Sequence, residues 1–201
     1  MTNIEPFIAY FKLLHQDLNK LEFKLDSKNR IYFPLLSSSV DHCIAINFLN
    51  KEYMTASMYA LIRPALESYL RAMWIKHCCG EIPVDADLTT MHIPKRIEVL
   101  MQDVDEKVPD FKANNYLQTT LGTLAPNLHD FTHGGIQSIA RQYSEDTLTN
   151  IRNDKEIMSI LKLSVLISSL AYAEIIQDNV GSEVLKPDVI ASSALHLLTE
   201  L

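Results

Sequence analysis

Residues 54–78 read MTASMYALIRPALESYLRAMWIKHC, and this stretch decides the fold class of the chain. Its residues, placed at helical spacing, are apolar on nearly every side, which is typical of a central helix surrounded by others. Pro64 falls in the middle, where its missing N–H and bulky ring predict a kink. The sequence therefore predicts a long core helix against which other helices pack.

Helical patterning continues on both sides of this core helix. Apolar residues recur at three and four positions before and after it, whereas the chain has only 5 Gly and 8 Pro and lacks the evenly spaced turns of a sandwich or barrel. One of the serines at 37–39 is expected to cap the second helix. The predicted helices cover residues 4–25, 36–50, 54–78, 89–102, 111–121, 126–143 and 154–177, with a last one from Pro187, and residues 80–87 form a loop. We predict an all-α helical bundle of about seven or eight helices.

Length, charge and cysteine usage narrow the class of protein. The 201 residues are 47% hydrophobic, which favours a single domain over residues 1–201. A net charge of −7 excludes a broad basic surface for nucleic acid or anionic lipid, although a small basic site is still compatible with it. Three cysteines without a C-x-x-C pair favour a reducing compartment, and residues 1–10 show no export signal. We expect a cytoplasmic protein with no membrane contact, because Lys162, Glu174 and four serines make residues 157–176 a core helix rather than a membrane span.

A stripe of charge follows one face of the core helix. Arg63, Glu67 and Arg71 are spaced by four, and Trp74 continues that face. An unpaired charge removed from water costs several kcal/mol, so these groups must pair with each other, with another helix or with a ligand. An internal salt-bridge ladder and a polar pocket are both compatible with this pattern.

A second stripe lies in residues 126–143. His129, His133, Gln137 and Arg141 repeat at four and share a face if the helix continues through the glycines at 134 and 135. We expect the two stripes to face one another, across the fold or across a homodimer interface, and to form one pocket in which Trp74 and Arg141 contact a ligand.

Metal chemistry is one interpretation of the second stripe. Imidazoles one turn apart, as in His129-x-x-x-His133, can chelate zinc or iron, and Asp130 stands where the zincin motif H-E-x-x-H has its glutamate. Asp is one methylene shorter, and spacing indicates no third ligand. We therefore predict no metal and no other cofactor, and keep a metal-dependent hydrolase using His129 and His133 as an alternative.

RNA cleavage is a second interpretation, based on a resemblance. The segment from Arg71 to His77, RAMWIKH, resembles the motif of HEPN ribonucleases, in which Arg, four to six residues and then His meet at a dimer interface. The resemblance implies that His77 assists proton transfer and that Arg71 stabilises charge on phosphate. Ala72 departs from the family, which usually has a polar residue after the arginine.

A wider resemblance covers roughly residues 36–180. The blocks DHCIAI (41–46), ALIRPALE (60–67), RAMW (71–74) and LHDFTHGG (128–135) resemble uncharacterised bacterial all-helical proteins that are themselves similar to HEPN proteins. The resemblance implies that the two stripes form one constellation. We predict a homodimeric, HEPN-like RNA-cleaving or nucleotide-binding protein of bacterial defence or toxin type, with catalytic residues Arg63, Glu67, Arg71, His77, His129 and His133. The alternative is a non-enzymatic module in which both stripes are structural and which binds a protein partner.

Overall fold

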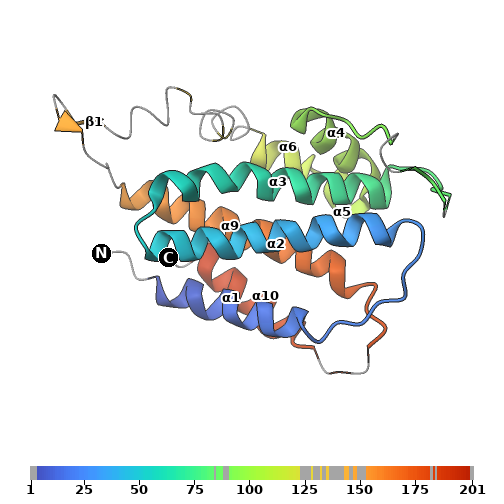
Figure 1. Cartoon of the computed structure of the whole chain (residues 1–201), viewed down its shortest axis with the longest axis horizontal. Helices are drawn as coiled ribbons and strands as arrows, with labels where there is room; N and C mark the ends of the chain where they lie inside the picture. The colour runs from blue at the N-terminus through green and yellow to red at the C-terminus, as the bar shows by residue number, and fades with distance from the viewer. Residues whose placement is uncertain are drawn as a thin grey trace.

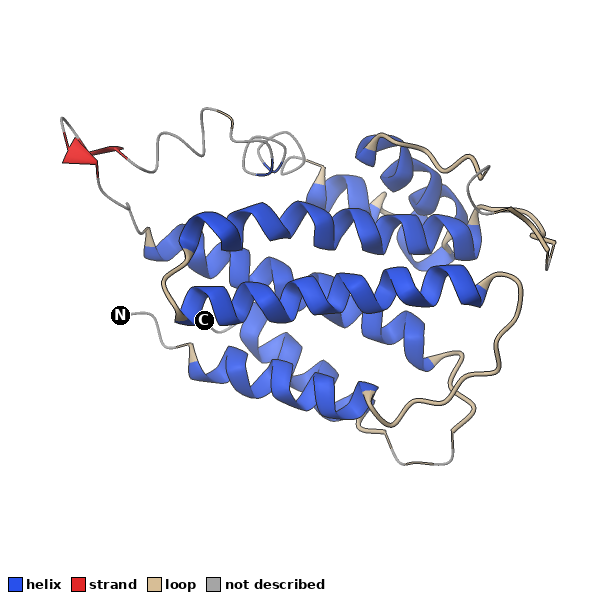
Figure 2. Cartoon of the chain, in the orientation of Figure 1, coloured by secondary structure: helices blue, strands red, loops and turns tan. Residues whose placement is uncertain are grey.

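The computed structural model is an all-α bundle. It describes residues 4–83, 85–87, 91–122, 128, 132, 135, 143–144, 147–148, 153–181, 183 and 185–199. In this part of the chain the elements are α1 (Glu5–Leu18), α2 (Asn29–Lys51), α3 (Thr55–His77), α4 (Ile97–Lys107), α5 (Pro109–Lys112), α6 (Tyr116–Leu121), β1 (Tyr143–Ser144), β2 (Thr147–Leu148), α9 (Asp154–Ile176) and α10 (Pro187–Thr199) (Figure 1). The two short strands pair antiparallel and lie away from the helices (Figure 2). The predicted fold class is confirmed.

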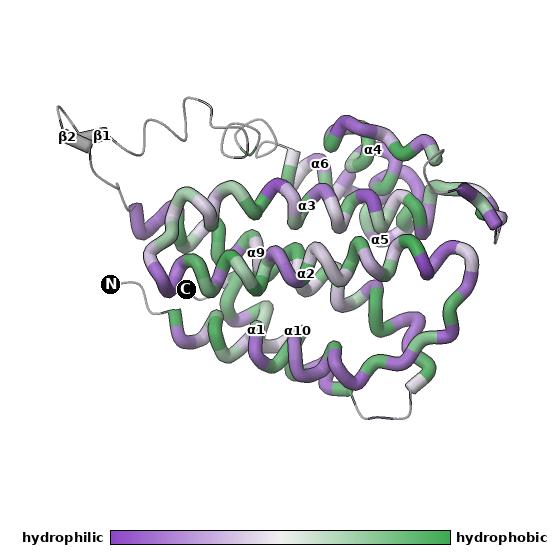
Figure 3. The backbone as a smooth tube through the Cα atoms, in the orientation of Figure 1, coloured by the Kyte–Doolittle hydropathy of each residue, from purple (hydrophilic) through white to green (hydrophobic). Residues whose placement is uncertain are grey.

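Three long helices form the centre of the bundle. Helices α2 and α3 are antiparallel, are joined by a short turn and pack against each other along their length. Helix α9 packs against both of them. Helices α1 and α10 contact each other and both contact α9. Helix α4 packs against α3, and the short helices α5 and α6 pack against α4 (Figure 1). Hydrophobic and hydrophilic residues alternate along the helices (Figure 3), as amphipathic packing requires.

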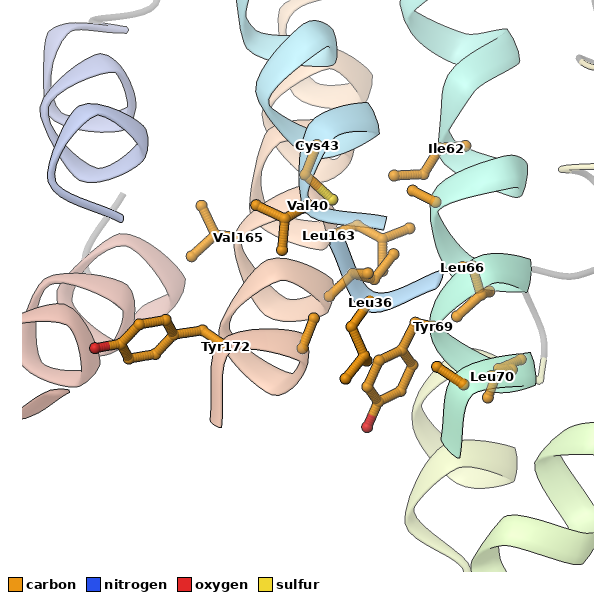
Figure 4. Close-up of a cluster of buried hydrophobic side chains, with 14 of the residues drawn as sticks. Leu36, Val40, Cys43, Ile62, Leu66, Tyr69, Leu70, Leu163, Val165 and Tyr172 are labelled. Carbon is orange, nitrogen blue, oxygen red and sulfur yellow. The ribbon is translucent and has the colours of Figure 1, made fainter. Parts of the chain in front are cut away.

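The core lies between α2, α3 and α9. Figure 4 shows Leu36 of α2 close to Leu66 and Tyr69 of α3, and all three side chains are buried. Among the described residues, α9 is the one helix apolar and long enough to cross a membrane, and 61% of its most apolar window is buried within the bundle. Its hydrophobicity therefore serves the core.

Two predicted helices have other boundaries in the structure, one because of a tertiary contact and one because of a local side-chain hydrogen bond. The helix expected to reach residue 25 ends at Leu18, since the backbone of Glu22 bonds to Asn179 Oδ1 at 3.0 Å and to the N–H of Val180 at 2.9 Å. The second helix begins at Asn29 rather than residue 36, because Asp26 Oδ1 accepts the N–H groups of Lys28 and Asn29, each at 2.7 Å. The expected cap at residues 37–39 is wrong, since these serines lie inside α2.

The region after α3 also differs from expectation. The helix predicted over residues 89–102 runs from Ile97 to Lys107, because Pro94 disfavours helical backbone just before it. The helix predicted over residues 111–121 is divided into α5 and α6 by Asn115, whose backbone is left-handed with φ 46°. The predicted helices over residues 54–78, 154–177 and from Pro187 are confirmed to within a residue or so.

Candidate functional site

The first stripe forms a ladder of ion pairs on α3. Arg63 Nε lies 2.7 Å from Glu67 Oε1, and Arg71 Nη2 lies 3.1 Å from Glu67 Oε2. The side chains of Arg63, Glu67 and Arg71 are 17%, 19% and 36% exposed. One carboxylate therefore holds two guanidinium groups in place while all three groups keep contact with solvent.

Pro64 links this ladder to a distant part of the chain. A proline has no N–H, so the carbonyl of Ala60, four residues earlier, has no partner from within the helix. The hydroxyl of Thr132 lies 3.5 Å from that carbonyl oxygen and 3.1 Å from the carbonyl oxygen of Leu128. Leu128 is itself buried. Thr132, in the stretch predicted to carry the second stripe, thus contacts α3 beside its proline.

A pocket of about 230 Å³ opens at this junction. Its lining consists of Arg63, Pro64, Glu67, Ser68 and Arg71 of α3 together with Thr132. Each guanidinium carries five N–H donors, and the ladder engages one nitrogen of each. Within the described part of the chain neither arginine makes another hydrogen bond, so the pocket presents several free donors and a formal charge of +1 from its two arginines and one glutamate. Such a wall suits a small anion that can accept several hydrogen bonds.

Trp74 and His77 lie outside this pocket, although the sequence grouped them with its arginines. Trp74 donates its indole N–H to Asp103 Oδ2 of α4 at 2.8 Å. His77 Nε2 lies 3.3 Å from Glu174 Oε2 of α9. Because Arg71 and His77 are six residues apart, their side chains leave α3 roughly 120° apart. Within one chain the two halves of the HEPN-like motif therefore face different neighbours.

His77 belongs to a separate polar cluster between α3, α9 and α2. Lys76 Nζ lies 3.0 Å from both Glu174 Oε2 and Asp178 Oδ2, and Tyr32 donates its hydroxyl to Asp178 at 3.0 Å. Burial alone would raise the pKa of Glu174, but hydrogen bonds from His77 and Lys76 outweigh it and the net pKa lies below the usual value. Glu174 is thus held ionised beside the imidazole of His77.

The second stripe lies outside the described residues. This applies to His129, His133, Gln137 and Arg141, to the helix predicted over residues 126–143, and to the metal interpretation of the histidine pair. The part of the chain that the structure describes contains no group of three or more His, Cys, Asp or Glu side chains placed to hold a metal ion. From the stretch that carries the second stripe, Thr132 is the described residue that lines the α3 pocket.

Sequence reasoning missed Ser68 and Thr132 as lining residues. Ser68 follows directly after Glu67 and gave no signal by spacing. A signal for Thr132 did exist, since a proline inside a helix leaves a carbonyl free and a hydroxyl donor is a suitable partner for it. The sequence could not show which of the many hydroxyl groups would reach it.

The comparisons with known proteins give one match. Residues 36–180 match a family described as Family of unknown function (DUF6988). This range contains α3, α9 and the pocket, while α1 and α10 fall outside it. No curated protein and no solved structure matches the chain.

Proposed function

Since the chain belongs to this family of unknown function, DUF6988, its role has to come from the site, and we propose that the pocket on α3 binds a phosphate group of RNA or of a nucleotide. One observation carries the proposal. Arg63 and Arg71 both pair with the carboxylate of Glu67 in the wall of an open pocket. Each arginine keeps further N–H groups that can donate hydrogen bonds to a ligand. Arginine's planar fork matches the oxygens of a phosphate.

Overall charge limits what can bind. The chain carries a net charge of −7, so its average surface repels a polyanion and attraction is limited to local cationic sites such as this pocket. A volume of about 230 Å³ has room for one or two phosphate groups rather than a duplex. The proposed ligand is therefore a nucleotide, or one or two phosphates of a single strand.

The test is the affinity for a fluorescein-labelled single-stranded RNA and for an unlabelled nucleotide as competitor, measured by fluorescence anisotropy. Each charge-assisted hydrogen bond contributes about 1.5–3 kcal/mol, so Arg63→Ala and Arg71→Ala should each weaken binding about tenfold or more. Arg96→Ala is the matched control, because Arg96 is 77% exposed and lies outside the pocket. Equal affinities of wild type and Arg71→Ala, or an equal loss in Arg96→Ala, would refute the proposal.

RNA cleavage is the second candidate function, and the pair formed by His77 and Glu174 favours it. A carboxylate 3.3 Å from an imidazole can orient it and stabilise its protonated form, as in general acid–base sites. Because Arg71 points elsewhere, joint action requires His77 and Arg71 from two copies, which agrees with the dimer interface that the HEPN resemblance implies. The predicted homodimer, cytoplasmic location and bacterial defence or toxin role remain parts of this proposal.

Cleavage is tested by incubating RNA with the wild type, His77→Ala and Arg71→Ala and separating the products on a gel. His92→Ala serves as the control, since His92 is exposed and lies outside both clusters. We expect degradation by the wild type and the control, and at least a hundredfold loss in the two other variants. Intact RNA with the wild type would exclude cleavage and leave phosphate binding standing.

A further inference from the structure

A second surface, remote from the α3 pocket, lies between α1 and α2. It holds two pockets of about 340 and 360 Å³. The first is lined by Ile8, Phe11, Lys12 and His15 of α1 and by Ile44, Asn47, Phe48 and Lys51 of α2. The second is lined chiefly by Leu18, Leu21, Phe23 and Leu25, and by Arg30, Phe33, Pro34 and Ser37 of α2. We call the two pockets together the α1–α2 groove.

Spacing shows that the two pockets lie along one line. On α2, the spacing is four and three within each pocket: Arg30, Pro34 and Ser37 line one, and Ile44, Phe48 and Lys51 line the other. The two sets keep one heptad register, and exposed Asp41 occupies the position between them. The lining residues of α1 include Ile8, Phe11, His15 and Leu18, with the same alternation. At 1.5 Å per residue the α2 stripe is about 32 Å long. Two helices that present such stripes to a shared groove have the geometry that receives a third helix.

Large apolar side chains remain uncovered in this groove. Phe48 in one pocket is 63% exposed, and Leu25 in the other is 69% exposed. Exposed apolar surface arranged in a line marks a contact site more often than isolated apolar residues do. An apolar helix face that binds in the groove would cover these exposed side chains.

The charged lining residues have one sign. Lys12 and Lys51 flank the first pocket and Arg30 the second, while His15 adds a titratable group. Asp41 lies between the pockets on the same helix and lines neither. The chain as a whole has a net charge of −7, so the positive charge of the groove lining is opposite in sign to the charge of the protein as a whole. A partner with acidic flanks complements it.

We propose that the α1–α2 groove binds an acidic amphipathic helix of a partner protein, with apolar residues at heptad spacing and Asp or Glu beside them. The length of the stripe favours a helix of about 20 residues over a small amphipathic acid, which would fill one pocket and leave the other open. This site is independent of the phosphate pocket.

The test uses a synthetic helical peptide of about three heptads with leucine at the a and d positions and glutamate at e and g, and a matched peptide with lysine at e and g. Binding is followed by fluorescence anisotropy. The glutamate peptide should bind the wild type at least tenfold more tightly than the lysine peptide. Phe48→Ala should weaken it about fivefold or more, and this exposed side chain can be removed without opening the core.

Charge reversal separates a specific groove from general stickiness. The double variant Lys12→Glu/Lys51→Glu should reverse the preference between the two peptides, whereas Lys95→Glu/Lys112→Glu, which makes the same change of net charge at exposed positions outside the groove, should leave it unaltered. Three results would overturn the proposal: no binding of the glutamate peptide, equal binding of both peptides, or equal effects of the two double variants. Self-association of the wild type that Phe48→Ala abolishes would also overturn it, by assigning the groove to a second copy.

Discussion

At the scale of single residues, one buried carboxylate ties three segments together. Asp17 of α1 is 1% exposed and accepts hydrogen bonds from the Tyr172 hydroxyl, from the backbone N–H of Lys186 at 2.9 Å and from Lys20 Nζ at 3.0 Å. Burial alone would raise the pKa of Asp17, but these bonds outweigh it and hold the pKa below its usual value. A lowered pKa in the folded state means that ionised Asp17 stabilises the fold.

The lowered pKa of Asp17 determines how stability depends on pH. The contribution of Asp17 is fully present above the pKa that the unfolded chain has, roughly 4, and is lost as pH falls through the lower folded pKa. Asp17→Asn should lower the free energy of unfolding at pH 7 by about 2–3 kcal/mol and reduce its further loss on acidification. Urea denaturation between pH 7 and pH 3 measures both, with exposed Asp41→Asn as the control. An acid loss as steep in Asp17→Asn as in the wild type would contradict this assignment.

The buried hydroxyl of Tyr69, unlike the carboxylate of Asp17, is expected to destabilise the fold. Tyr69 is fully buried in the core (Figure 4), and its hydroxyl has no hydrogen-bond partner among the described residues. Because an unpaired buried polar group costs about 1–3 kcal/mol, Tyr69→Phe should leave the free energy of unfolding unchanged or raise it by about 1 kcal/mol. Thermal and urea denaturation give this value. A loss of 1 kcal/mol or more would mean that the hydroxyl is bonded in solution.

At the scale of helices, two side chains accept hydrogen bonds from the first turns of α6 and α9, one in the interior and one at the surface. Asp105 of α4 is fully buried and accepts the N–H groups of Leu117 and Gln118 at 2.9 and 3.0 Å, which fixes the start of α6 against α4. Asn153 accepts the N–H groups of Lys155 and Glu156 at 3.0 and 3.3 Å at the exposed start of α9. Both satisfy donors that a helix leaves free at its first turn.

Removing these caps should cost unequal amounts. Asn153→Ala is expected to lower the free energy of unfolding by about 1 kcal/mol, the usual value for an exposed cap. Asp105→Ala should cost about 2–3 kcal/mol, because it leaves the buried N–H of Leu117 unpaired, frees the half-buried N–H of Gln118 and removes a contact between helices. Urea denaturation of both variants compares them directly. Equal losses would show that burial of Asp105 adds nothing to the cap.

The same scale explains what the sequence could and could not predict. Periodicity identified α3, α9 and α10, because each buries a face whose spacing is visible in one segment. It failed at residues 19–28, where Glu22 pairs with residues 179–180, since a contact across the whole chain leaves no local pattern. The ladder of Arg63, Glu67 and Arg71 was predictable because spacing by four is local. The partners of Trp74 and His77 were not, because Asp103 and Glu174 come from other helices.

At the scale of the whole molecule, local cations stand out against an acidic average. The chain has a net charge of −7, yet Arg63 and Arg71 face a pocket on α3 and Lys12, Arg30 and Lys51 line the α1–α2 groove. Most of the residues that line the groove precede the residues matched by the family, whereas the α3 pocket lies within them. An acidic protein with two small basic surfaces is expected to bind few anions, each at a defined place.

Phosphate binding at the α3 pocket can be tested by the salt dependence of RNA affinity. Counterion release makes the logarithm of the association constant fall with the logarithm of the salt concentration, with a slope of about −0.7 for each phosphate contacted on a single strand. Two contacted phosphates therefore predict a slope of about −1.4 for the wild type. Arg63→Ala/Arg71→Ala should bring the slope close to zero, and Arg96→Ala should retain it. A double variant whose slope equals that of the wild type would show that the phosphates bind elsewhere on the protein.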